Sequence, residues 1–272
     1  MTSKEATNQL GRSAAPYRIR FPSSADSGLD QDEEWCVVTL ADGTEERLRF
    51  HDYHEIYPHP GLYEQIFREK LACSSPEIVV GLLERQLKAN GADASDLSVL
   101  DLGAGNGMVG EELKGIGAGM VIGVDIIEEA AEAAERDRSG LYDDYLVEDF
   151  TDLPDATAKQ LRSHNLNTLV CVAALGFGDI PPLAFATAYD LLGPDGWLAF
   201  NIRDEFLEDG RGGFARLIHA MYKDRWIELL DSERYVHRLS SVDGKPLHYV
   251  AMVARKLGPA SAREHVEELE AK

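Results

Sequence analysis

Residues 99–110 form the segment of this chain best suited to binding a ligand. They read VLDLGAGNGMVG, an apolar strand followed by glycines at positions 103, 105, 107 and 110. Such a loop brings bare backbone close to a ligand, and the helix that follows favours polar or anionic groups. The stretch 105–110 fits the G-x-G-x-x-G pattern of dinucleotide-binding loops. The overlapping stretch 101–107, which reads DLGAGNG, instead fits a loop that binds a different cofactor. In both interpretations the ligand lies where the strand ends.

Acidic residues at three expected strand ends bear on this choice. Asp101 lies where a dinucleotide enzyme normally has an apolar residue, and its carboxylate suits a cationic amino group such as that of a methionine moiety. Asp125 can accept from both hydroxyls of a ribose, which either cofactor offers. Asp149 can accept from an adenine amino group while Phe150 covers the ring. The structural alternatives are a turn cap for Asp101, a helix cap for Asp125 and plain surface charge for Asp149.

The elements that must position these residues alternate between strand and helix. Near-continuous apolar stretches predict strands at 98–102, 120–126, 143–150, 168–175 and 196–202, with helices between them and at 213–223. Two further strands, at 226–239 and 247–257, flank the turn VDGKP. This pattern predicts an α/β fold, a Rossmann-like, doubly wound and mostly parallel seven-stranded sheet closed by a C-terminal antiparallel hairpin.

The N-terminal region lacks this alternation. Residues 1–34 show no clear period and predict a flexible arm, and residues 35–50 predict a hairpin with its turn at Asp42-Gly43. The stretch HDYHEIYPHPGLYE (51–64) holds two prolines and a glycine, which predict a structured, lid-like loop. Ser75-Pro76 then opens a helix, with Ser75 as its N-cap. The expected divisions are 1–34 arm, 35–63 hairpin and lid, 64–258 main domain and 259–272 polar tail.

The sequence from about 98 to 256 resembles the class I S-adenosylmethionine-dependent methyltransferases. VLDLGAGNG is similar to their first motif, VIGVDI carries the acid of the second strand, and EDFTDLP resembles the signature of the third. LLGPDGWLAF resembles the family's L-x-P-G-G element, with Asp195 in place of the first glycine. The branch it resembles is the small-molecule "type 11" group, including the Williams–Beuren-region methyltransferase-like proteins. The first 60 residues lie outside this common core, where substrate choice usually resides.

The resemblance implies S-adenosyl-L-methionine as cofactor and methyl transfer to an O, N or C atom of a small-molecule acceptor. The alternatives are an NAD(P)-dependent oxidoreductase and a non-catalytic binding protein of the same fold. The expected cofactor-binding residues are Asp101, Gly103, Ala104, Gly105, Asn106, Gly107, Asp125, Ile126, Asp149, Phe150, Ala173, Tyr57 and Tyr63. For the two tyrosines, core packing is an equal alternative.

An amine or hydroxyl acceptor can require removal of a proton. The candidate bases are His54, His59, Asp179 after the fourth strand and Asp204 after the fifth. The spacing of His51, His54 and His59 matches no common zinc site, and no cysteine completes it, so no metal is expected.

Composition limits the partners and the compartment. The chain has 272 residues, 44% of them hydrophobic, and a formal net charge of -21. Such a charge repels phosphate backbones, so no nucleic-acid partner is expected. No apolar stretch has the length of a membrane span, and the three scattered cysteines are typical of a reducing cytoplasm. The sequence leaves the oligomeric state open.

Overall fold

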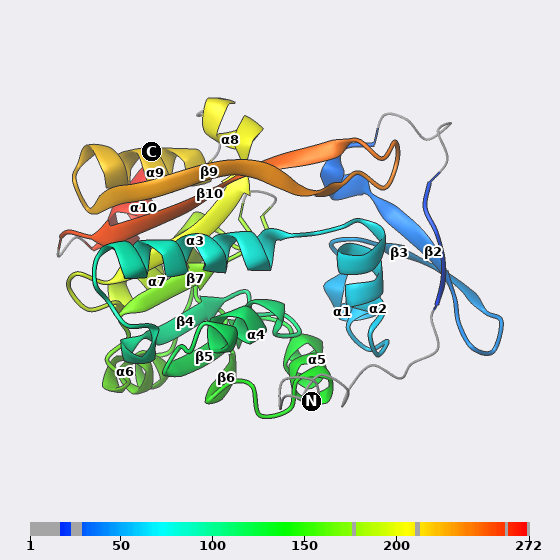
Figure 1. The fold of residues 1–272 in the computed structure, drawn as a ribbon, viewed down its shortest axis with the longest axis horizontal. Helices are drawn as coiled ribbons and strands as arrows, with labels where there is room; N and C mark the ends of the chain where they lie inside the picture. The colour runs from blue at the N-terminus through cyan, green and yellow to red at the C-terminus, as the bar shows by residue number, and fades with distance from the viewer. Residues whose placement is uncertain (1–16, 23–28, 176–177, 210–212, 259–260, 271–272) are drawn as a thin grey trace.

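A central seven-stranded sheet organises the chain. The computed structural model describes residues 17–22, 29–175, 178–209, 213–258 and 261–270. The strand order is β6-β5-β4-β7-β8-β10-β9, with β4 to β8 parallel and β10 antiparallel to both of its neighbours (Figure 1). The strands are β4 (Ser98–Leu102), β5 (Met120–Asp125), β6 (Asp144–Val147), β7 (Thr168–Cys171), β8 (Trp197–Arg203), β9 (Ile227–Leu239) and β10 (Pro246–Lys256). The predicted fold class is therefore confirmed.

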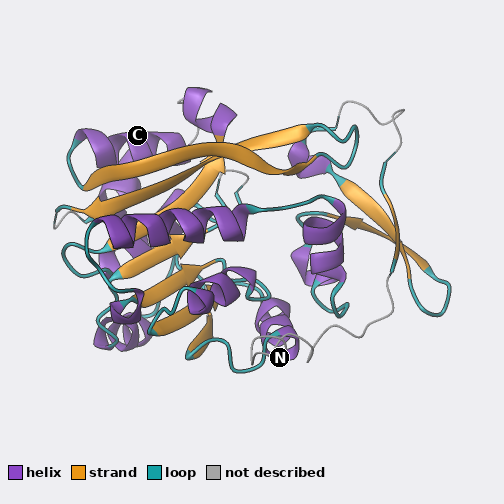
Figure 2. Cartoon of the chain, in the orientation of Figure 1, coloured by secondary structure: helices purple, strands orange, loops and turns teal. Residues whose placement is uncertain are grey.

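Helices cover both faces of this sheet, which explains why its strands are apolar on both sides (Figure 2). On β4, Val99 packs into one core and its neighbour Leu100 into the other, because successive side chains of a strand point to opposite faces. One face carries α3 (Ser75–Ala89) and α4 (Met108–Gly115), and the other carries α6 (Asp155–Ser163), α7 (Pro182–Leu191), α9 (Gly213–Lys223) and α10 (Ala262–Glu270). The remaining long helix is α5 (Glu128–Asp137), and α8 (Asp204–Asp209) follows β8. Among the described residues, no helix combines the length and apolar character of a membrane span.

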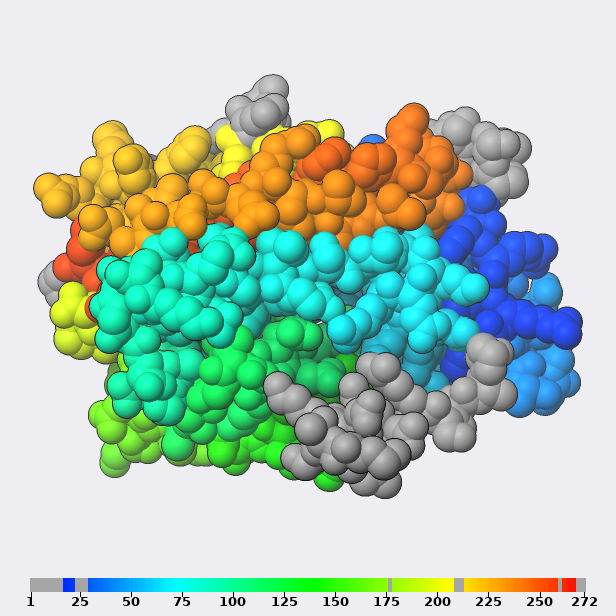
Figure 3. Space-filling model, viewed as in Figure 1, coloured from blue at the N-terminus to red at the C-terminus, as the bar shows by residue number. Residues whose placement is uncertain are grey.

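A smaller antiparallel sheet precedes the main one. It consists of β1 (Arg18–Arg20), β2 (Trp35–Thr39) and β3 (Glu45–Arg49) in that order. The predicted hairpin corresponds to β2 and β3. The sequence pattern missed β1, because three residues are too few to show a period, and most of the predicted arm lies outside the described residues. In the space-filling view this sheet forms one end of the molecule (Figure 3).

The segment that joins the two sheets is partly helical. It contains α1 (Tyr53–Ile56), α2 (Leu62–Glu64) and a π-helical stretch, Gln65–Lys70. The prediction of a loop over 51–64 is thus corrected. Each α-helix is a single turn, and the Pro58 to Gly61 stretch separates them, because proline donates no backbone hydrogen bond and Gly61 has a left-handed φ of 73°.

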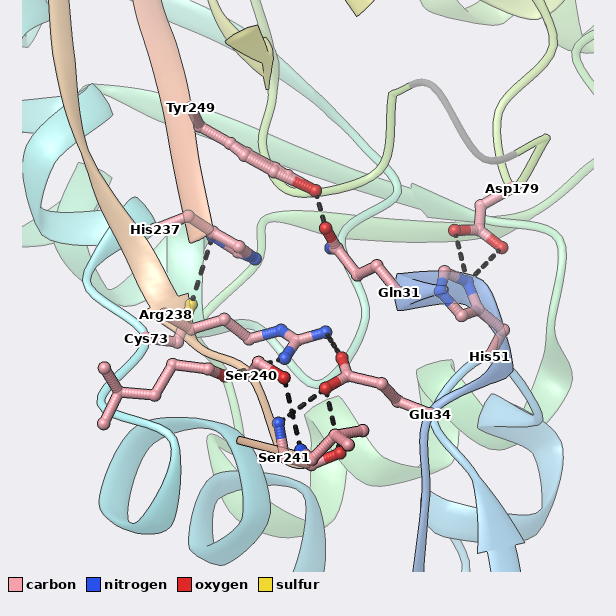
Figure 4. Close-up of polar contacts among 12 residues, drawn as sticks. Gln31, Glu34, His51, Cys73, Asp179, His237, Arg238, Ser240, Ser241 and Tyr249 are labelled. Atoms are coloured by element: carbon pink, nitrogen blue, oxygen red, sulfur yellow. Dashed lines mark hydrogen bonds and ion pairs between the residues drawn. The ribbon is translucent and has the colours of Figure 1, made fainter. Parts of the chain in front are cut away.

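Buried charges attach this N-terminal region to the main sheet. Glu34, which follows the short 3₁₀ helix Gln31–Glu33, is 1% exposed and lies 2.5 Å from the guanidinium of Arg238 on β9 (Figure 4). The second carboxylate oxygen of Glu34 accepts from the backbone N–H and the hydroxyl of Ser241. This carboxylate is therefore fully enclosed by partners from the far end of the chain. A second 3₁₀ turn, Ala94–Asp96, leads into β4.

The start of α3 differs by one residue from the prediction. Ser74 is the N-cap residue, and Ser75, expected as the cap, is the first residue of the helix. The hydroxyl of Ser75 lies 2.6 Å from both the Tyr235 hydroxyl and Nδ1 of His237, so this side chain joins a buried polar cluster and does not cap the helix.

Candidate active site

The glycine loop between β4 and α4 is held against β5. The backbone N–H groups of Gly103 and Ala104 donate to the carbonyl oxygen of Val124 at 2.8 and 2.9 Å. Gly103, Gly105 and Gly107 have left-handed φ angles of 76°, 53° and 90°, which favour glycine. A Cβ atom at Gly103 would lie 2.8 Å from the Ile180 side chain. The loop therefore needs glycine both for its conformation and for the closeness of its neighbours.

Asp125 at the end of β5 completes this loop. Its carboxylate accepts from the backbone N–H of Gly105 at 2.9 Å and of Ile127 at 3.2 Å. Burial raises the pKa of this carboxyl, and the two backbone hydrogen bonds oppose that rise. Because each carboxylate oxygen has two lone pairs, both oxygens retain capacity to accept from a ligand.

Two adjacent cavities lie at the carboxyl ends of the parallel strands, the position where open α/β sheets bind ligands. The larger encloses about 240 Å³ and the smaller about 50 Å³. The larger is lined by His51, Tyr53, Tyr57, Tyr63, Leu102, Gly103, Val124, Asp125, Ile126, Ile127, Glu148, Asp149, Phe150, Val172, Ala173, Ala174, Asp179, Ile180, Pro181 and Ala184. The smaller is lined by Tyr57, Tyr63, Phe67, Cys73, Pro76, Gly103, Ala104, Gly105, Asn106, Met108, Val109, Val172 and Ala173.

Three tyrosines from the N-terminal segment form one wall of the larger cavity. Ring centroids of Tyr57 and Tyr63 are 5.1 Å apart, and those of Tyr53 and Tyr57 are 6.0 Å apart. Burial raises the pKa of all three phenols, so they remain protonated at neutral pH. The Tyr57 hydroxyl lies against the glycine loop, where a Cβ atom at Gly105 would come within 2.5 Å of it. Tyr57 and Tyr63 line both cavities and so lie between them.

Asp101 lies beneath the glycine loop. Its side chain is buried, and one oxygen accepts from the Tyr142 hydroxyl at 2.8 Å, while the other has no hydrogen-bond partner among the described residues. Burial raises the pKa of Asp101 to about 7, the Tyr142 hydrogen bond lowers it and nearby Asp125 raises it further. A carboxyl whose pKa is raised by burial is therefore positioned behind the candidate ligand site.

This pKa predicts a pH-dependent stability for the protein without ligand. Because the folded-state pKa lies above the ordinary value of 3.8, Asp101 stabilises the fold fully below about pH 4, and this contribution is lost as pH rises to about 7. The slope from this group is at most about 1.4 kcal/mol per pH unit. Urea unfolding of the wild type and of Asp101→Asn between pH 5 and 8 measures it. We expect the difference in unfolding free energy between the two proteins to change with pH, and a constant difference would show that Asp101 is ionised throughout.

The structure gathers most of the predicted cofactor residues around the two cavities. These are Gly103, Ala104, Gly105, Asn106, Asp125, Ile126, Asp149, Phe150, Ala173, Tyr57 and Tyr63. Asp101 and Gly107 line neither cavity. Asp149 already accepts from the backbone N–H and the hydroxyl of Thr151 through one oxygen, and these bonds lower its pKa.

The candidate bases are distributed differently. Asp179 lines the larger cavity, whereas His54, His59 and Asp204 line neither. His54 is exposed, His59 lies 3.3 Å from Glu46, and Asp204 forms an ion pair with Arg234. No cluster of three metal-ligating side chains occurs among the residues that the structure describes.

Sequence reasoning did not select His51 as a base. Its Nδ1 lies 2.9 and 3.1 Å from the two carboxylate oxygens of Asp179, and both residues line the larger cavity (Figure 4). Sequence spacing carries no sign of this pair, because 128 residues separate its members. The sequence offered one signal, which is that His51 directly precedes the segment that carries Tyr53, Tyr57 and Tyr63.

Comparison with known proteins gives a consistent result. A family model described as a methyltransferase domain matches residues 68–245. No curated protein sequence gave a match. Among solved structures, the N-methyltransferase NodS from Bradyrhizobium japonicum with bound S-adenosyl-L-homocysteine aligns with a TM-score of 0.51 at 12% identity, covering 76% of this chain and 97% of that one. A candidate RNA methyltransferase from Pyrococcus horikoshii aligns with a TM-score of 0.50 at 13% identity, covering 68% and 88%. At these identities the likeness concerns the fold alone.

Proposed function

Since this chain belongs to the methyltransferase-domain family and is an S-adenosylmethionine-dependent methyltransferase, we propose that it methylates an O, N or C atom of a small molecule bound in the larger cavity. The supporting observation is how that cavity is built. The carboxyl ends of the parallel strands form its floor, and three tyrosines of the N-terminal segment form a wall. The family match begins at residue 68, so these tyrosines come from outside the matched part.

The residues around the cavities fit S-adenosylmethionine. Asp125 retains lone pairs that can accept from the ribose hydroxyls. Phe150 offers an aromatic wall to the adenine ring, and the second carboxylate oxygen of Asp149 can accept a hydrogen bond from the adenine amino group. The bare backbone around Gly103 and Gly105 suits the methionine end, with the buried carboxyl of Asp101 behind it. When bound, this cofactor supplies a methyl group on a sulfonium leaving group. The protein then has to align the acceptor and keep water out.

The charge of the cavity favours an uncharged acceptor. Its described lining has four carboxylates, namely Asp125, Glu148, Asp149 and Asp179, and neither lysine nor arginine. A phosphate or carboxylate on the acceptor would meet like charge there without a cation to offset it. This composition, together with the net charge of -21, favours a small neutral molecule over a nucleic acid.

Ligand-dependent melting tests the cofactor assignment. We expect S-adenosylhomocysteine to bind with micromolar or better affinity and to raise the melting temperature by several degrees, while NAD and NADP leave it unchanged, because only the first matches the residues around the glycine loop. Stabilisation by NAD alone would contradict the assignment. An acceptor screen with labelled methyl donor then separates an enzyme from a protein that binds the cofactor without turnover.

A further inference from the structure

His51 and Asp179 reach the larger cavity from two distant parts of the chain. His51 follows β3 of the small sheet, and Asp179 lies in the connection between β7 and α7. Their side chains are partly buried, 17% and 24% exposed. With the Asp179 carboxylate as acceptor, Nδ1 of His51 donates, and the basic nitrogen of the neutral ring is then Nε2. The carboxylate thus fixes both the tautomer and the orientation of the imidazole.

The other ionisable side chains of the cavity have different tasks. Asp125 accepts from the glycine loop, Asp149 from Thr151, and Glu148 from the Thr157 hydroxyl at 2.9 Å. The three tyrosine phenols stay protonated because burial raises their pKa values. Imidazole is also the side chain used most often for proton transfer near neutral pH. His51 is the imidazole of the described lining, and its contact with Asp179 makes it the candidate proton acceptor there.

We propose that His51, oriented by Asp179, removes the proton from a hydroxyl group of the acceptor, and that the acceptor is a phenol-like aromatic alcohol. This inference rests on the proposed methyltransferase function. In the reaction a lone pair of the acceptor oxygen forms the new C–O bond, the C–S bond breaks with its electron pair left on sulfur, and the hydroxyl proton passes to Nε2 of His51. The imidazolium, stabilised by Asp179, later returns this proton to water.

A built-in base favours a hydroxyl over the other possible nucleophiles. An amine can attack as its free base and lose a proton afterwards, and a carboxylate needs no base at all. The O–H group of a hydroxyl becomes strongly acidic while its oxygen is being methylated. The hydroxyl proton therefore has to leave during the transfer. The cavity lining also opposes a carboxylate acceptor, because it holds four acids and no described cation.

The walls of the cavity favour an aromatic ring. Tyr53, Tyr57 and Tyr63 offer ring faces or edges, and Ala174, Ile180, Pro181 and Ala184 add small apolar surfaces. Aromatic pairs stack or meet edge to face with an energy beyond that of area burial alone. A flat ring with one hydroxyl matches both this surface and the single oriented base.

The test compares His51→Gln and Asp179→Asn with wild type, and uses His219→Gln on the exposed side of α9 as the matched control. Isothermal titration with S-adenosylhomocysteine is the first readout, and we expect both cavity variants to bind within about twofold of wild type. With a panel of unactivated phenols we expect His51→Gln to lose about 10²- to 10⁴-fold in kcat, the range of general-base catalysis. Asp179→Asn loses less, and its loss falls in kcat more than in KM, as expected of a positioning residue.

A nitrophenol that is fully ionised at neutral pH, 2,4-dinitrophenol, provides the decisive comparison. We expect the His51→Gln defect to shrink to less than about tenfold with this acceptor, since no proton has to be removed, while His219→Gln matches wild type throughout. An equal loss with phenol and nitrophenol would overturn the role of His51. Methylation of anilines but not phenols, unaffected by His51→Gln, would overturn the acceptor class and leave the methyltransferase function intact. Failure to bind S-adenosylhomocysteine at all would instead reject the proposed function on which the inference rests.

Discussion

Replacing Arg238 with Met is expected to lower the free energy of unfolding by about 3–5 kcal/mol, the cost of removing one partner from a buried ion pair. Arg238 is 3% exposed, and its guanidinium lies 2.5 Å from Glu34 and also donates to the carbonyl oxygen of Leu239. Without it, the carboxylate of Glu34 stays buried with a missing counter-charge. Urea unfolding followed by circular dichroism measures the loss. Adding Glu34→Gln to this variant should recover part of the stability, because it removes the unpaired charge.

An exposed ion pair within the small sheet is the control. Arg20 and Glu45 are 3.2 Å apart, with side chains 67% and 58% exposed. Arg20→Ala should change stability by less than about 1 kcal/mol, as surface pairs do. Two outcomes would contradict this account of the buried pair. The first is that Arg238→Met and Arg20→Ala lower the free energy of unfolding by similar amounts. The second is that the variant with both Arg238→Met and Glu34→Gln loses as much stability as the two single variants together.

Asp125→Ala is expected to weaken binding of S-adenosylhomocysteine by about 1.5–3 kcal/mol, the scale of hydrogen bonds to a charged acceptor. This corresponds to a rise of about 10- to 150-fold in Kd. The carboxylate would accept from the ribose while it holds the N–H of Gly105. The variant therefore loses both a ligand contact and the brace of the glycine loop. Isothermal titration gives Kd directly, and thermal melting in the absence of ligand shows whether the fold survives.

Asp125→Asn separates the two tasks of this residue. Its amide oxygen can still accept from Gly105, but only one oxygen remains and the negative charge is gone. We expect its affinity to lie between those of Asp125→Ala and wild type. A folded Asp125→Ala protein with unchanged affinity would reduce Asp125 to a structural cap of the loop.

The main sheet was predictable from the sequence because the apolar pattern of each strand and helix agrees with the burial of its residues in the fold. A helix was expected between the strands predicted at 120–126 and 143–150, and α5 lies there with its alanines Ala130, Ala133 and Ala134 buried. The strands β4, β5 and β7 are apolar on both sides because helices cover both faces. The residues of the glycine loop were found for a similar reason, since their conformation is set by the loop itself.

The acceptor side of the cavity was not predictable in this way. It depends on contacts between segments far apart in the chain, such as His51 with Asp179, and no local period records such a meeting. His54 illustrates the difficulty, because it lies three residues from His51 in a similar composition, yet its side chain is 61% exposed and outside both cavities. Similarly, Asp204 follows a strand end as Asp179 does, but it pairs with Arg234.

The contact between Glu34 and Arg238 spans 204 residues of sequence, which has a consequence for the growing chain on the ribosome. At about 5–20 residues per second, synthesis of that interval takes about 10–40 s. The small sheet and the tyrosine segment emerge first, but the strand that buries Glu34 is among the last to be made. The carboxylate of Glu34 therefore waits for the guanidinium of Arg238 until β9 has been made, whereas the apolar cluster of this segment draws its buried members from residues 36–71 alone. All residues that line the two cavities lie between positions 51 and 184, so the whole lining is synthesised before Glu34 can meet its counter-charge.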